Sequence, residues 1–97
     1  MNNLLKIKEE LNECGQVLYR EEKGGFWVKN EYDDLGRIIH HWDSTGYEYW
    51  RTYKEDGGYD FHLVYPAGIS KKDINGFEEW SSYDVSGNLI KQKRVNG

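Results

Sequence analysis

The chain has 97 residues and a net charge of −4 at neutral pH, values that limit it to one domain and argue against direct nucleic-acid binding. Hydrophobic residues make up only 37% of the chain, but aromatic residues reach 15%, which argues against disorder. The one cysteine, Cys14, excludes an internal disulfide. We therefore expect residues 1–97 to form a single domain whose small core depends on large aromatic rings.

The predicted elements are almost all strands, because the apolar residues alternate along the chain. Residues 3–11 suit either a strand or a short helix, and no other segment has a clear helical period. The inserted segment 66–75 contains the only proline and is predicted to be a loop. The last strand is basic, as is typical of an edge strand that resists aggregation. The predicted strands are 4–11, 16–22, 26–32, 37–43, 46–53, 59–65, 76–83 and 88–95.

A turn motif recurs along the chain and sets the register. Glycines at 15, 36, 57 and 87 are spaced by 21, 21 and 30 residues, and an Asn or Asp precedes three of them by three positions. This pattern is typical of a type I turn followed by a left-handed glycine, which closes a four-residue hairpin with a bulge. The predicted cross-strand pairs are all apolar: Leu11–Val17, Tyr32–Ile38, Tyr53–Tyr59 and Tyr83–Leu89.

The fold class that follows is all-β: an antiparallel meander of seven to eight strands built from 21-residue hairpin repeats. Alternation places most tyrosines, with Trp42, on one core-like face, and sets the other tryptophans among charges on the opposite face. Since no long helix is predicted to cover the core-like face, we expect the sheet to curl into a barrel or sandwich, or to pair with a second copy.

The two best copies of the motif, 32–38 and 83–89, resemble the YD repeats of RHS-type proteins. The resemblance spans roughly residues 24–95, although Lys54 breaks the Tyr-Asp pair and 66–75 breaks the period. It implies an antiparallel repeat sheet and an origin in bacteria, phages or mobile elements. It transfers no active site, because such repeats are architectural.

No catalytic or metal-ligating pattern emerges from the sequence. Neighbouring His40 and His41 should point to opposite faces of a strand, and His41 with His62 lacks the further ligands of a zinc site. Paired carboxylates along the chain fit a solvated surface, and Cys14 falls at a turn position. We therefore predict a protein that is not an enzyme and needs no cofactor or metal.

The mixed face is the candidate binding surface. Trp50 and Trp80 occupy the same position of the repeat, and exposed aromatic residues commonly mark interfaces. The acids around them suit a partner with a basic, nucleic-acid-facing surface. If these tryptophans instead form the core, the two faces are inverted. The predicted binding residues are Trp27, Trp50, Trp80, Glu31, Glu48, Glu78, His41 and His62.

Small size, acidity and an aromatic surface favour a protein-binding inhibitor from a phage or mobile element. Its expected partner is a bacterial nucleic-acid-handling enzyme, as for anti-CRISPR-type inhibitors. Three alternatives stay open: an immunity protein for a cognate toxin, a carbohydrate-binding module, and a structural fragment that pairs through its edge strands. The amino-terminal residues lack the apolar run of a signal peptide, so we expect a cytoplasmic protein without a membrane span.

Overall fold

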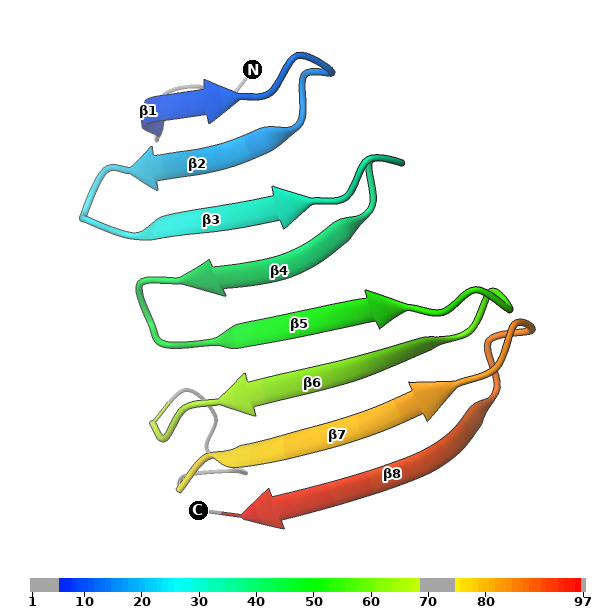
Figure 1. Ribbon diagram of the computed structural model, residues 1–97. Coiled ribbons are helices and arrows are strands. Elements are labelled where there is room, and N and C mark those ends of the chain that lie inside the picture. Colours follow the sequence, from blue (N-terminus) through cyan, green and yellow to red (C-terminus); the bar gives the residue numbers. More distant parts are fainter. Residues whose placement is uncertain (1–5, 69–74, 97) are drawn as a thin grey trace.

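The computed structural model describes residues 6–68 and 75–96, which form one antiparallel sheet (Figure 1). Its eight strands follow the chain order β1 to β8 as a meander, and each pairs with its sequence neighbours. The bounds are β1 Lys6–Leu11, β2 Val17–Glu22, β3 Trp27–Tyr32, β4 Ile38–Asp43, β5 Glu48–Tyr53, β6 Tyr59–Tyr65, β7 Phe77–Tyr83 and β8 Leu89–Asn96. The all-β meander is thus confirmed. Of the segment with two alternatives, residues 6–11 form a strand, and residues 3–5 lie outside the described part.

The predicted turns are formed by local side-chain chemistry. In the β3–β4 hairpin, Asp33 Oδ1 accepts hydrogen bonds from the backbone N–H groups of Leu35 and Arg37, both at 3.0 Å. Gly36 closes the turn at φ +80°, a left-handed conformation that glycine adopts without strain. Asn12 and Asp84 bind their own turns in the same way. All four predicted cross-strand pairs are present in the pairing of the strands.

The opposite ends of the strands use the same turn. The N–H of Gly25 donates to the carbonyl of Glu22 at 3.0 Å, and that of Gly46 donates to the carbonyl of Asp43 at 3.1 Å. Gly25 and Gly46 also have positive φ. These two glycines therefore close turns of their own, in addition to the turns at Gly15, Gly36, Gly57 and Gly87. The 21-residue period is two successive hairpin turns, one at each end of the strands.

The sheet stays open, and the expected closure into a barrel or sandwich does not occur within one chain. Edge strands β1 and β8, with the two termini, lie at opposite ends of the sheet (Figure 1). The molecule measures 42 × 36 × 18 Å, the thickness of a single layer with its side chains. Because one layer has no second layer to cover it, no hydrophobic residue of the described segments is buried. The insertion, apart from 66–68 and 75, lies outside the described residues.

The register assigns the side chains to two faces. The face with all four tryptophans, here called the tryptophan face, bears Trp27, Lys29, Glu31, His40, Trp42, Glu48, Trp50, Asp60, His62, Glu78, Trp80 and Lys93. The opposite face, here called the tyrosine face, bears Val28, Tyr32, His41, Tyr49, Arg51, Tyr53, Tyr59, Phe61, Leu63, Tyr65, Phe77, Glu79 and Tyr83.

Candidate functional site

A ladder of stacked rings crosses the centre of the tryptophan face. It consists of five rings in the order Trp42, His40, Trp50, His62 and Trp80, taken from strands β4 to β7. Successive ring centroids lie 4.0, 5.0, 4.9 and 4.8 Å apart, with interplanar angles of 22° or less. Trp42 and His40 stack two residues apart on the same strand, β4. The other three spacings match the distance of about 4.8 Å between hydrogen-bonded strands, so residues directly opposite each other stack without distortion.

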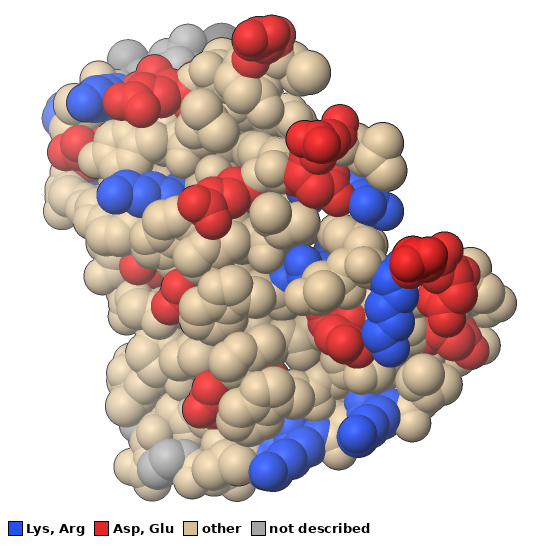
Figure 2. Space-filling model, viewed as in Figure 1, with Lys and Arg blue, Asp and Glu red and all other residues tan. Residues whose placement is uncertain are grey.

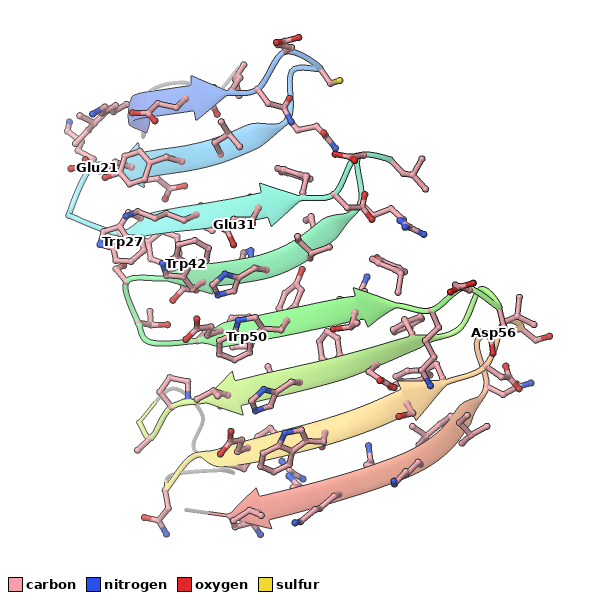
Figure 3. All side chains as sticks on the ribbon, viewed as in Figure 1. Glu21, Trp27, Glu31, Trp42, Trp50 and Asp56 are labelled. Carbon is pink, nitrogen blue, oxygen red and sulfur yellow. The ribbon has the colours of Figure 1, made fainter. Side chains whose placement is uncertain are left out.

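The ladder has a basic end. On edge strand β8, Lys93 lies opposite Trp80, with its Nζ 5.7 Å from the ring centroid. At the other end, Lys29 is the cross-strand partner of Trp42 and holds its Nζ 5.2 Å from the Trp27 ring. Figure 3 shows Trp27, Trp42 and Trp50 on the same side of the sheet.

Carboxylates hold the histidines of the ladder. His40 Nδ1 lies 2.9 Å from Glu31 Oε1, and His40 Nε2 lies 2.6 Å from Glu48 Oε2. His62 Nε2 lies 2.6 Å from Glu78 Oε2. His40 can donate a hydrogen bond to both carboxylates only when both of its ring nitrogens carry a proton. The three acids therefore fix the orientation of the two histidine rings.

The centre of this face is acidic, and its β8 end is basic. Among the described residues, strands β4 to β7 place acids but no Lys or Arg on it, and β8 places lysines but no acid. Strands β1 to β3 place both signs there, with Lys8 and Lys29 beside Glu10, Glu21 and Glu31. Figure 2, viewed as Figure 1, shows a mostly uncharged surface with acids in red and Lys and Arg in blue. The Ser82 hydroxyl donates to Asp60 Oδ1 at 2.7 Å, and this hydrogen bond is the main cause of a lowered pKa for Asp60.

A shallow hollow of about 430 Å³ lies at the β5–β8 end of the ladder. Its lining includes Trp50, His62 and Trp80, with Asp60 and Lys93 among the charged groups. Trp80 is 38% exposed, a high value for a ring of this size. The hollow therefore combines aromatic edges with charges of both signs.

Seven of the eight predicted binding residues share this face, and His41 does not. His41 lies on the tyrosine face, where its Nδ1 is 2.6 Å from Asn30 Oδ1 and its ring stacks on Tyr49 with centroids 5.0 Å apart. Burial lowers the pKa of His41, so its ring is a neutral member of the tyrosine face. Its place in the ladder belongs to His40.

A β-bulge causes this exchange. The register shifts between Glu31 and Tyr32, so that Ile39 is an extra residue between Ile38 and His40. Strict alternation from Ile38 puts Trp42 on the core-like face, whereas the bulge moves both His40 and Trp42 to the tryptophan face. The turn type predicts a bulge in this hairpin, but it does not show which strand carries the extra residue.

The described residues show neither a group of side chains that could hold a metal ion nor a helix that could cross a membrane. Within residues 6–68 and 75–96, no three His, Cys, Asp or Glu side chains converge in a way that could hold a metal ion. The same residues contain no helix with the length and apolar character required to cross a bilayer. Cys14 is exposed in the first turn.

Comparison with known proteins adds no relative. No family model, no curated protein and no solved structure matches the chain. The function must therefore be inferred from the two faces of the sheet.

Proposed function

We propose that the chain is a non-enzymatic inhibitor that binds a protein through its tryptophan face. The partner is a bacterial nucleic-acid-handling enzyme, and the specific role is counter-defence of the anti-CRISPR type for a phage or mobile element. The observation that carries the proposal is the open aromatic ladder with an acidic centre. Such a surface complements a basic, nucleic-acid-facing patch of the partner.

The geometry favours a protein partner because the ladder is pre-formed. Each ring of the ladder is already fixed by its neighbours, so little side-chain entropy is lost when a partner covers it. Tryptophans in such a setting are frequent anchors of protein interfaces. The half-exposed Trp80 beside the hollow is the side chain best placed to act as the anchor.

The same stacking argues against the carbohydrate-binding alternative. A sugar ring binds to the flat face of an aromatic side chain, but His40 and His62 occupy both faces of Trp50 at 5.0 and 4.9 Å. One face of Trp80 is likewise covered by His62, and Lys93 lies over the ring. The ladder thus presents ring edges and carboxylates to solvent, which suits polar and cationic protein groups.

The test is capture of a partner from bacterial lysate, with and without nuclease, by matched charge variants. Glu78→Lys reverses one acid on the tryptophan face, and Glu55→Lys makes the same change in the exposed β5–β6 turn. The captured enzyme is then assayed for nucleic-acid binding with added wild-type protein. Circular dichroism checks that both variants remain folded.

The proposal predicts stoichiometric, nuclease-insensitive capture of an enzyme whose nucleic-acid binding is inhibited. Capture should fall at least tenfold for Glu78→Lys and remain unchanged for Glu55→Lys, a difference of about 1.4 kcal/mol. Capture that is equal for both variants would show that another surface binds. A cognate toxin as the captured protein would favour an immunity protein, and quenching of tryptophan fluorescence by glycans would favour the carbohydrate-binding alternative.

A further inference from the structure

The tyrosine face is a largely aromatic layer that residues 6–68 and 75–96 leave uncovered. Rings stack across it from strand to strand, with centroids of Tyr59 and Tyr83 at 4.8 Å and of Tyr65 and Phe77 at 5.0 Å. Its side chains are only partly buried. Partial burial still raises the pKa of Tyr47 and Tyr49, so their hydroxyls stay neutral. This surface has the composition of a protein core but lacks a second layer.

The exposed area of the chain is that of a molecule with a missing partner. It exposes 6863 Å², whereas a compact monomer of 11.5 kDa exposes about 5,800 Å². The excess of about 1,000 Å² is close to the ~800 Å² that each partner buries in a stable protein interface. One sheet packed against the tyrosine face would remove such an area.

Arg51 shows where a partner is required. It lies in the middle of the tyrosine face, with its guanidinium carbon 5.1 Å from the Tyr59 ring centroid and 5.2 Å from that of Phe61. Its Nε is buried without a hydrogen-bond partner, and none of the ion pairs found in the described residues includes it. A buried arginine donor without an acceptor is costly, so an acid from outside the chain would stabilise it.

The same face carries an acid, Glu79, whose Oε1 lies 3.9 Å from Arg94 Nε on β8, so that it would bridge Arg94 and an arginine from outside the chain. Arg51 is opposite Phe61 on β6, and Glu79 on β7 is opposite Leu63. Two strand spacings and two residues separate Arg51 from Glu79, about 12 Å, which is too far for an ion pair within one chain. A twofold axis that runs parallel to the sheet, midway between two layers, would bring each Arg51 to the Glu79 of a second copy if it crosses over β6 between Phe61 and Leu63 at right angles to the Arg51–Glu79 line.

We propose that two copies pack their tyrosine faces together as a β-sandwich, with a twofold axis at β6 and reciprocal Arg51–Glu79 ion pairs. Face-to-face sheets lie about 10 Å apart, which the interdigitating rings of this face can fill. The second copy supplies the core that a single layer lacks. The tryptophan faces then point outward on both sides of the dimer, so the inference is independent of what that face binds.

Charge exchange with sedimentation analysis tests the proposal. Arg51→Glu and Glu79→Arg each place like charges together, whereas the double variant restores the pair with reversed sign. Thr52→Glu is the matched control, because it adds an acid next to Arg51 but on the tryptophan face. Circular dichroism verifies the fold of each variant, and each molar mass is measured over a range of protein concentrations.

We expect wild type and Thr52→Glu to be dimers with micromolar or tighter dissociation constants, about −8 kcal/mol or better. Each single charge variant should weaken the dimer at least tenfold, and the double variant should return to within about threefold of wild type. A monomeric wild-type chain at about 100 μM would overturn the proposal. A double variant whose loss of dimerisation free energy equals the sum of the losses in the two single variants would overturn the ion pair and the position of the axis.

Discussion

Replacement of Trp50 by leucine should destabilise the fold more than the same replacement of Trp80. Trp50 stacks on two rings, those of His40 and His62, whereas Trp80 stacks on His62 alone and has Lys93 on its other side. Stacked aromatic pairs contribute about 0.5–1.5 kcal/mol each beyond the area they bury. Trp50→Leu therefore loses about 1–3 kcal/mol from stacking, and Trp80→Leu loses about half as much.

A double-mutant cycle isolates the stacking contribution. Trp50→Leu is combined with His62→Leu, and urea unfolding is followed by circular dichroism at one fixed protein concentration. We expect a coupling free energy of about 0.5–1.5 kcal/mol, and less than about 0.5 kcal/mol for the control pair of Trp50 with Tyr19, three strands away. Equal losses for the two tryptophans, with no coupling to His62, would refute the ladder as a stabilising unit.

Three further outcomes follow from the turns. Gly36→Val should cost more than about 1 kcal/mol, because φ is +80° and a new Cβ would meet only the Gln16 side chain, and an unchanged melting temperature would contradict the left-handed turn. Gly58→Ala should lower the melting temperature more than Gly87→Ala, because its Cβ would lie 2.5 Å from the Tyr83 carbonyl oxygen, whereas at Gly87 nothing lies within 4 Å and only the left-handed φ of +86° opposes alanine; the reverse order would show that the backbone contact at Gly58 is not made. Backbone N–H groups lower the pKa of Asp33 and Asp84 below 3.8, so the stabilisation that these carboxylates give is present above that pH and is lost as the pH falls through the lower folded pKa. Asp33→Asn with Asp84→Asn should therefore make stability less dependent on pH below about pH 4. An acid-unfolding curve that matches wild type would show that these carboxylates do not contribute.

The sequence predicted the local parts of the fold because each hairpin turn is formed by residues close in the chain. Asp33 binds the N–H groups two and four positions ahead, and Gly36 supplies the left-handed conformation. These contacts need no distant partner, so a repeat of Asp and Gly is enough to locate the strands and the pairs nearest each turn. The edge position of β8 was predictable for the same reason, because it follows the last turn.

The candidate site was predictable in kind but not in every residue. The tryptophans and acids of the face could be located by alternation from their turns, as for Trp50, Trp80 and Glu78. Strict alternation from Ile38 misplaces His40 and Trp42, because it does not count Ile39, the extra residue of the bulge beside the turn. A single extra residue reverses the faces of all residues that follow in the strand.

Turn chemistry in the sequence thus predicted a meander of seven to eight strands and the pairs beside each predicted turn, and the structure has eight strands in that order. Only the tertiary structure decided that histidines and tryptophans alternate in one ladder and that the sheet stays open. The physical reason is distance along the chain: a turn is satisfied within five residues, whereas ring stacking joins strands β4 to β7. The alternation of apolar residues specifies that a face must be covered, but it does not specify which layer covers it.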